Sequence, residues 1–177
     1  SMSDDVIDAK IANVQKVDYE RIGEQMNAES VSVKFDGDKD KYIKLVEKVA
    51  ALNKVVVLVC ADVAVATEAL ALVKAAKPVL VGANKDNIND MVALAKGNGA
   101  VLGLSADTVE DMYSLVEAAH AADYKELVLN PSTASMAKTL ENTIEIRRTA
   151  ITGGDRVFGY PSIVFVNELA GGDPYLE

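Results

Sequence analysis

The side chains best suited to chemistry in this sequence are short polar residues that directly follow apolar runs. Amide, carboxylate and hydroxyl groups of this kind can hydrogen-bond to a small ligand or to a partner's backbone. In alternating strand–helix proteins, the strand ends are also where binding sites form. The same residue types cap helices and tie down loops, and we expect this structural role more often. The weak candidates are Asp62, Asn84, Asn130 and Asn167, accompanied by Lys85, Asp107 and Ser132.

Cys60 and His120 are the only cysteine and the only histidine. A thiolate nucleophile needs a nearby base or positive field, and no histidine lies near Cys60 in the sequence, so we expect a buried, inert thiol. His120 stands among alanines late in a predicted helix, where a surface role or a contact with the helix C-terminus is expected rather than general-base catalysis. These two residues cannot supply the four ligands of a zinc or iron–sulfur site. We therefore expect no catalytic and no metal-binding residues.

Acidic residues outnumber basic ones by 27 to 18, which gives a formal net charge of −9 and argues against nucleic-acid binding. Arg147, Arg148 and Arg156 are candidates for contact with an anion or an acidic partner, although such residues commonly face solvent near a helix C-terminus. We find no apolar run of about 18 residues, so no membrane span is predicted. We also find no basic segment followed by an apolar one at the start, so secretion is not indicated. We expect a cytoplasmic protein with no membrane partner, and we interpret Ser1-Met2 as an expression remnant.

Apolar runs that alternate with helical stripes organise the chain. The runs are rich in Val, Leu and Ile and predict buried parallel strands. Between them, apolar residues at spacings of three or four predict helices that lie on a sheet, after a first helix over residues 4–16. Repeats of about 22 to 26 residues are typical of strand–helix–strand units. The runs cover residues 31–35, 55–60, 78–83, 100–105, 126–130 and 162–166.

Two parallel α/β architectures fit these elements, an open doubly wound sheet and a (β/α) barrel. The number of strands favours the open sheet, because a complete barrel needs about eight strands. Two features favour a barrel instead. The run at 31–35 is not followed by the glycine-rich turn of a dinucleotide-binding sheet, and no helix follows the last predicted strand, as if the chain were cut within a repeat. From the residues alone, the two alternatives are evenly balanced.

Five collinear stretches resemble the large (gamma) subunit of the corrinoid iron–sulfur protein, a component of the CO dehydrogenase/acetyl-CoA synthase system. One of them, residues 126–132 (ELVLNPS), is similar to a family segment that has Asp and Gly where this chain has Asn130 and Ser132. Asn keeps hydrogen-bonding capacity but loses the charge, so any binding role of that Asp is in doubt here. The other stretches are 19–25 (YERIGEQ), 77–87 (KPVLVGANKDN), 138–148 (KTLENTIEIRR) and 159–161 (GYP).

The resemblance implies that residues 1–177 form one incomplete TIM-barrel domain of about six strands. It also implies that the complete subunit carries a 4Fe-4S cluster domain and a corrinoid (cobalamin) domain, neither of which is in this chain, so we expect no cofactor to bind to the fragment itself. The partners implied are the small subunit, which is also a barrel, a methyltransferase and acetyl-CoA synthase.

Three functional hypotheses follow. The resemblance favours a scaffold and docking domain of a methyl carrier, which takes a methyl group from a methyltetrahydropterin or folate and passes it to acetyl-CoA synthase. A self-contained methyltransferase-like barrel would instead grip a pterin through Asn84 and Asn130. An open-sheet protein that binds a small molecule is the third hypothesis. An incomplete barrel leaves strand edges and part of its inner face uncovered, so we also expect self-association or marginal stability.

Overall fold

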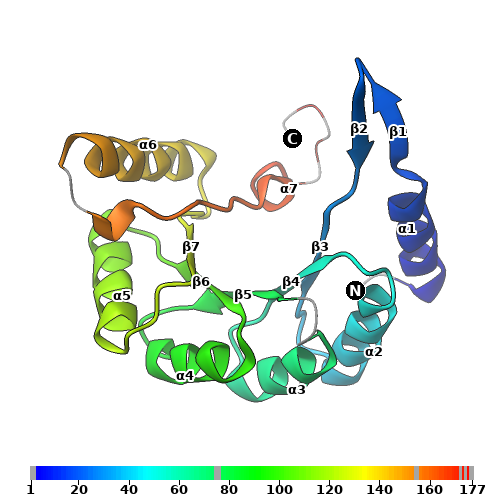
Figure 1. The fold of residues 1–177 in the computed structure, drawn as a ribbon, viewed down its shortest axis with the longest axis horizontal. Coiled ribbons are helices and arrows are strands. Elements are labelled where there is room, and N and C mark those ends of the chain that lie inside the picture. Colours follow the sequence, from blue (N-terminus) through cyan, green and yellow to red (C-terminus); the bar gives the residue numbers. More distant parts are fainter. Residues whose placement is uncertain (1–2, 74–76, 154–155, 172, 174, 176–177) are drawn as a thin grey trace.

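Five parallel strands form the central sheet in the sequential order β3-β4-β5-β6-β7 (Figure 1). The computed structural model describes residues 3–73, 77–153, 156–171, 173 and 175, so the expected remnant Ser1-Met2 lies outside the described residues. Each strand coincides with one of the predicted apolar runs. The strands are β3 (Ser30–Lys34), β4 (Val55–Val59), β5 (Val79–Ala83), β6 (Val101–Ser105) and β7 (Leu127–Asn130).

Helices α2 to α5 connect these strands and follow an arc around one side of the sheet, with α6 continuing the series after β7 (Figure 1). Because every crossover joins neighbouring strands and the strand order never reverses, the sheet has no switch point of the doubly wound kind. The predicted (β/α) barrel type is therefore confirmed, although the described strands do not close into a barrel. The helices are α2 (Lys39–Ala50), α3 (Val63–Val73), α4 (Ile88–Asn98), α5 (Val109–Ala121) and α6 (Met136–Thr152).

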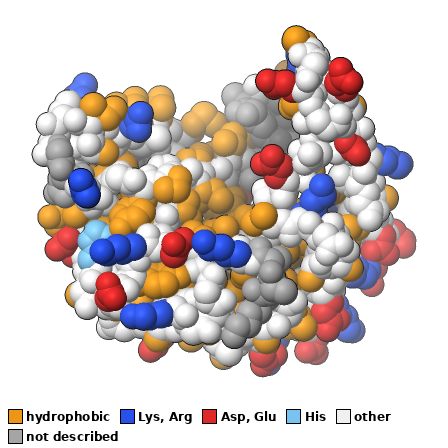
Figure 2. Space-filling model, viewed as in Figure 1, with side chains coloured by type: hydrophobic (Ala, Val, Ile, Leu, Met, Phe, Trp, Pro, Cys, Tyr) orange, Lys and Arg blue, Asp and Glu red, His pale blue; other side chains and the backbone are white. Residues whose placement is uncertain are grey.

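The core lies between the sheet and the helices. Successive side chains of a strand point to opposite faces, and the residues on the helix side are almost completely buried. Burying one such leucine contributes about 1.5–3 kcal/mol relative to leaving it exposed. The concave side carries smaller residues, and the space-filling view shows hydrophobic side chains along the hollow between α6 and an N-terminal hairpin of residues 18–27 (Figure 2). The helix-side leucines are Leu58, Leu80, Leu102, Leu104 and Leu129, and the opposite face carries Val57, Val81, Gly103 and Val128.

The N-terminal segment contains an expected helix and an unexpected hairpin. Helix α1 (Asp4–Lys16) matches the predicted range, yet it has no buried residue. Strands β1 (Asp18–Arg21) and β2 (Glu24–Asn27) pair antiparallel and stand apart from the central sheet (Figure 1). All of their side chains are exposed. Because no apolar alternation marks these strands in the sequence, the hairpin was not predicted.

The strand predicted at 162–166 is mostly wrong. Only Ser162 pairs with the sheet, as an isolated parallel bridge to Leu129. The prolines Pro131 and Pro161 flank this contact, and a proline cannot donate a ladder hydrogen bond, so the pairing does not extend. The backbone then turns into the short helix α7 (Val166–Leu169), after the 3-10 turn η2 (Arg156–Phe158). Within the described ranges, no helix is both long and apolar enough to cross a membrane.

Candidate functional site

A row of polar side chains runs across the carboxyl ends of three strands. The strand register pairs Ala83 with Leu104 and Ser105 with Asn130, which places Asn84, Ser105 and Asn130 at the same level of β5, β6 and β7. Neighbouring strands lie about 4.8 Å apart. The row borders a pocket of about 390 Å³, which we call the polar pocket. Four of the predicted candidates line it, namely Asn84, Lys85, Asp107 and Ser132.

Asn130 is buried at this row, and both ends of its side-chain amide are engaged. Its Nδ2 donates to Ser105 Oγ over 3.1 Å, and its Oδ1 accepts from the Ser132 backbone N–H over 3.2 Å. An ionised carboxylate has no hydrogen to donate, so an Asp at position 130 could not donate to Ser105 Oγ as Asn130 does. Because Ser105 Oγ acts as acceptor, its own hydroxyl hydrogen is left for the pocket.

Several other polar groups of the polar pocket have no partner among the described residues. Asn84 Oδ1 accepts from the Asp86 backbone N–H over 2.9 Å, which leaves Asn84 Nδ2 unused. The enclosed Ser132 Oγ has no hydrogen-bond partner in the described part of the chain. The Asp107 carboxylate lines the pocket, while its backbone oxygen accepts from the buried Asn142 Nδ2 over 2.9 Å. That bond from α6 holds the β6–α5 loop in place.

The polar pocket is negatively charged. One lysine, Lys85, stands against Asp86, Asp107 and Asp111, which leaves a net charge of −2 in the lining. Lys85 Nζ lies 2.5 Å from Asp111 Oδ1. This hydrogen bond with Lys85 is the main reason why the pKa of Asp111 is held below its usual value, with a smaller contribution from Thr108. The two remaining carboxylates disfavour an anionic ligand.

Asp62 has a structural role rather than a place in the polar pocket. Its Oδ1 accepts from the backbone N–H groups of Ala64 and Val65 over 2.9 and 3.0 Å. It therefore caps the start of α3.

Asn87 was not among the candidate site residues, yet it organises the loops beside the pocket. Its Oδ1 accepts from the Asn84 backbone N–H over 2.7 Å, and its Nδ2 donates to the backbone oxygens of Ala61 and Gly82 over 2.9 and 3.2 Å. It thus ties the ends of β4 and β5 together. The spacing of three residues between the two asparagines is the signal in the sequence that points to it. Ser105 was also missed, because it reads as the last residue of a strand.

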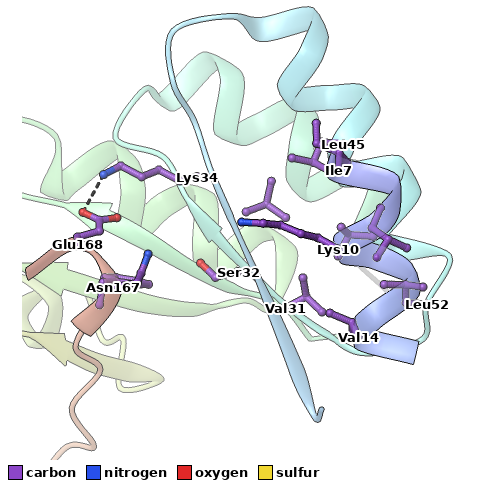
Figure 3. Close-up of a pocket in the computed structure, with 14 residues that line it drawn as sticks. Ile7, Lys10, Val14, Val31, Ser32, Lys34, Leu45, Leu52, Asn167 and Glu168 are labelled. Carbon is purple, nitrogen blue, oxygen red and sulfur yellow. Dashed lines mark hydrogen bonds and ion pairs between the residues drawn. The ribbon is translucent and has the colours of Figure 1, made fainter. Parts of the chain in front are cut away.

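Asn167 lies apart from the other candidates, in α7, at a second cavity of about 380 Å³ (Figure 3). This cavity, which we call the edge groove, lies between α1, β3 and α2. Lys34 of β3 and Glu168 of α7 form an ion pair across 2.8 Å at the α7 side. Its apolar walls are Ile7, Ile11 and Val14 from α1, Leu45 and Val49 from α2, and Leu52 from the turn that follows α2.

The edge groove follows a free edge of the sheet. Among the described residues, β3 pairs with β4 alone. Alternate residues of β3 bond to β4, as the Glu29 oxygen and the Phe35 N–H show. The backbone groups of Ser30, Ser32 and Lys34 consequently face away from the sheet. Unpaired strand edges and exposed apolar side chains both favour association with another polypeptide.

The remaining candidates do not come together. Cys60 is buried, its Sγ donates to the Asp62 backbone oxygen over 3.4 Å, and burial raises the pKa of its thiol. His120 Nε2 lies 2.6 Å from the Tyr160 hydroxyl, on the α5 side of the molecule. Arg147 lies on α6 and Arg156 in η2. In the part of the chain that the structure describes, no cluster of three His, Cys, Asp or Glu side chains is arranged to hold a metal ion.

Comparisons with known proteins give the family context of these sites. Residues 1–170 match the family described as CO dehydrogenase/acetyl-CoA synthase delta subunit. The corrinoid/iron-sulfur protein large subunit of Moorella thermoacetica is 32% identical over 179 residues, covering 100% of this chain and 40% of that protein. The acetyl-CoA decarbonylase/synthase complex subunit gamma of Methanopyrus kandleri is 33% identical over 171 residues, covering 92% of this chain and 36% of that protein. The chain thus spans two fifths or less of the length of these relatives.

A solved structure supports the fold. Dihydropteroate synthase from Thermus thermophilus superposes with a TM-score of 0.63 at 18% sequence identity, covering 97% of this chain and 73% of that chain. At this identity the likeness establishes a common fold, and function rests on the residues of the chain itself.

Proposed function

This chain belongs to the CO dehydrogenase/acetyl-CoA synthase delta subunit family, and we propose that it is the scaffold and docking domain of a corrinoid iron–sulfur methyl carrier. The predicted resemblance to the large subunit is confirmed by relatives that bear that name. The complete carrier would take a methyl group from a methyltetrahydropterin or folate and pass it to acetyl-CoA synthase. The single observation that carries this proposal is the family match, which runs from residue 1 to residue 170.

The described residues favour docking over catalysis. Catalytic nucleophiles and bases need a partner within hydrogen-bonding reach, and Cys60 is a buried thiol whose Sγ contacts a backbone oxygen. The chain has one cysteine, whereas a 4Fe-4S cluster is held by four thiolates. The residues present therefore do not fit the cluster, and the carrier's redox and methyl chemistry would take place elsewhere in the complete protein.

We expect the small subunit of the carrier to contact the edge groove. The groove combines a free strand edge with five apolar side chains from α1 and α2 and with Leu52 from the turn after α2. Burial of such side chains in an interface contributes about 25 cal/mol of binding free energy for each Å² of apolar area removed from water. The methyltransferase and acetyl-CoA synthase are proposed as further partners of the complete protein.

The docking proposal can be tested with two substitutions on the same helix. Ile11→Asp introduces a charge into the wall of the edge groove, while Val6→Asp introduces the same charge at a position of α1 that is 44% exposed. In calorimetric titrations with the small subunit, Ile11→Asp should weaken binding at least roughly ten-fold, since a buried unpaired charge is strongly unfavourable, and Val6→Asp should bind as the unmodified chain does. Equal affinity of both variants would remove the edge groove from the interface.

A further inference from the structure

Helix α6 exposes apolar side chains and buries polar ones. Its buried residues are Thr139, Asn142 and Ile146, whereas four large apolar side chains are 42% to 63% exposed. A helix on the surface of a domain usually has the opposite arrangement, with its apolar stripe towards the core. Exposed apolar patches bordered by polar residues mark sites of association. The four exposed residues are Met136, Leu140, Ile144 and Ile151.

These apolar residues share one side of α6 with an arginine. Positions 136, 140, 144, 147 and 151 are separated by three or four residues, and residues at this spacing lie along one face of a helix. In Figure 2, hydrophobic and basic side chains gather over α6, at the upper left of the view. We call this face the α6 stripe, which consists of Met136, Leu140, Ile144, Arg147 and Ile151.

Arg147 also lines a cavity of about 360 Å³ between α6 and the turn at residues 158–162. Ile146 and Phe158 contribute apolar walls, and no acidic side chain lines the cavity among the described residues. The guanidinium groups of Arg147 and Arg148 have no hydrogen-bond or ion-pair partner in the described part of the chain. The α6 stripe therefore borders a space for one large apolar side chain, beside an unpaired positive charge.

The acidic residues of α6 do not neutralise this charge. Glu141 and Glu145 occupy positions outside the stripe, and Glu141 forms an ion pair with Lys138 over 3.3 Å. The stripe and the described cavity lining together carry arginine and no carboxylate, in a chain whose formal net charge is −9. A local positive surface attracts acidic partners and fixes where they bind.

We propose that the α6 stripe binds an amphipathic helix of a partner protein that carries acidic side chains beside its apolar face. One apolar side chain of that helix fills the cavity, as anchor residues do when a helix lies in a groove. Its carboxylates pair with the guanidinium groups of Arg147 and Arg148, which match the geometry of a carboxylate. Because α6 follows β7, at the opposite edge of the sheet from β3, this contact is separate from the edge groove.

Two other occupants fit the α6 stripe less well. Helices that lie in a membrane surface combine several basic residues with Trp, Phe or Leu, whereas the stripe has one arginine and no aromatic residue, and the chain as a whole is acidic. A two-fold contact between copies places a surface against itself. Since the stripe contains arginine and no acid, a second copy of the stripe offers Arg147 no carboxylate.

Fluorescence anisotropy with two labelled peptides tests the proposal. Both peptides span about three heptads with Leu at positions a and d, and they carry either Glu or Lys at positions e and g. We expect saturable binding of the Glu peptide to the unmodified chain, at least roughly ten-fold tighter than that of the Lys peptide. Ile144→Asp should weaken binding of the Glu peptide at least roughly ten-fold, because it places a charge in the apolar contact.

Charge reversal separates a specific contact from a damaged fold. The double variant with Arg147→Glu and Arg148→Glu should reverse the preference, so that the Lys peptide binds more tightly than the Glu peptide. Leu72→Asp, the same kind of change at a 41% exposed position of α3, should leave the affinity for both peptides unchanged. Circular dichroism checks that every variant is folded.

Four outcomes would overturn the proposal. The first is the absence of saturable binding by the Glu peptide, and the second is equal affinity for both peptides. The third is sedimentation of the chain with vesicles of phosphatidylcholine and phosphatidylserine that Ile144→Asp abolishes, since the stripe would then be a lipid-binding face. The fourth is self-association that Ile144→Asp abolishes, since a second copy would then cover the stripe. Binding of the small subunit is measured separately, so failure here leaves the edge-groove proposal standing.

Discussion

At the scale of single residues, the core contains one polar group whose burial has a measurable cost. The Tyr42 side chain is 2% exposed and packs edge-to-face against Phe35, with ring centroids 5.4 Å apart. Its hydroxyl is buried without a hydrogen-bond partner among the described residues. Burial is the main cause that raises the pKa of Tyr42 above its ordinary value. The folded state therefore holds this proton more firmly than the unfolded chain does.

Replacing Tyr42 by Phe should raise the free energy of unfolding by about 1 kcal/mol, since the desolvation of an unpaired hydroxyl is avoided. A raised folded-state pKa means that stability is present below the unfolded pKa, about 10 for tyrosine, and is lost as the pH rises above it. Tyr42→Phe should therefore lose less stability at alkaline pH than the unmodified chain does. Part of the loss should remain in this variant, because burial also raises the pKa values of Cys60 and Tyr124.

Urea unfolding at about pH 7 and at about pH 10.5, on either side of the unfolded tyrosine pKa, measures both parts of this prediction. Tyr175→Phe is the matched control, because its side chain is 95% exposed and its hydroxyl removal should change neither value. A destabilised Tyr42→Phe at neutral pH would mean that the hydroxyl has a favourable contact in solution.

Asn130 tests what the amide contributes at a position where the resemblance leads us to expect Asp. Asn130→Asp restores the residue expected from the family segment but removes the Nδ2 donor to Ser105 and buries a carboxyl group at a position that is 8% exposed. Burial raises the folded-state pKa of a carboxyl group. Stability should therefore be nearly normal below about pH 4 and about 1–3 kcal/mol lower at about pH 7. Asn89→Asp, at an exposed position of α4, should show no such dependence in the same urea titrations.

At the scale of elements, two glycines set how closely the strands and their loops approach one another. A Cβ on Gly82 would lie 2.6 Å from the Cys60 backbone oxygen, and Gly82 has a φ of +135°. A Cβ on Gly103 would lie 2.7 Å from Val81 Cγ2. The glycines therefore allow β5 to approach the end of β4, and β6 to approach β5, at these distances. Gly97 differs, because a Cβ there meets nothing within 4 Å.

Alanine substitutions at these three glycines should have different signs. Gly82→Ala should cost about 3 kcal/mol or more, since both backbone strain and a clash arise. Gly103→Ala should cost about 1–3 kcal/mol from overpacking alone. Gly97→Ala, inside α4, should stabilise the protein by about 0.5–1 kcal/mol, because alanine is the better helix former. Thermal unfolding of the three variants ranks them, and a neutral Gly82→Ala would show that the β4 and β5 ends are free to separate.

The five central strands and their helices were predictable because each combines a run of buried residues with a periodic stripe. The hairpin β1–β2 was not, since its strands bury no side chain and so carry no alternation. The last predicted strand failed because an apolar run says nothing about whether a neighbouring strand offers free hydrogen-bonding groups. In the candidate site, residue type located Asn84 and Asn130, but Ser105, the partner of Asn130, depends on strand register, which no local pattern encodes.

At the scale of the whole molecule, the fold separates two surfaces of different character. The polar pocket lies at the carboxyl ends of β5 to β7, and the edge groove lies along β3, the strand at the opposite edge of the sheet from β7 (Figure 3). The first offers unpaired donors and a carboxylate, which suits a small polar ligand. The second offers a free strand edge and apolar side chains, which suits a polypeptide. One incomplete barrel wall can therefore combine ligand binding with docking.

The docking role is tested most directly by size-exclusion chromatography with light scattering, first of the chain alone and then mixed with the small subunit of a corrinoid iron–sulfur protein. The free edge of β3 predicts that the chain alone self-associates and that the small subunit replaces this self-contact with a one-to-one complex. Separate elution of the two proteins at micromolar concentrations, with the chain a stable monomer, would contradict the assignment of this domain as a docking scaffold.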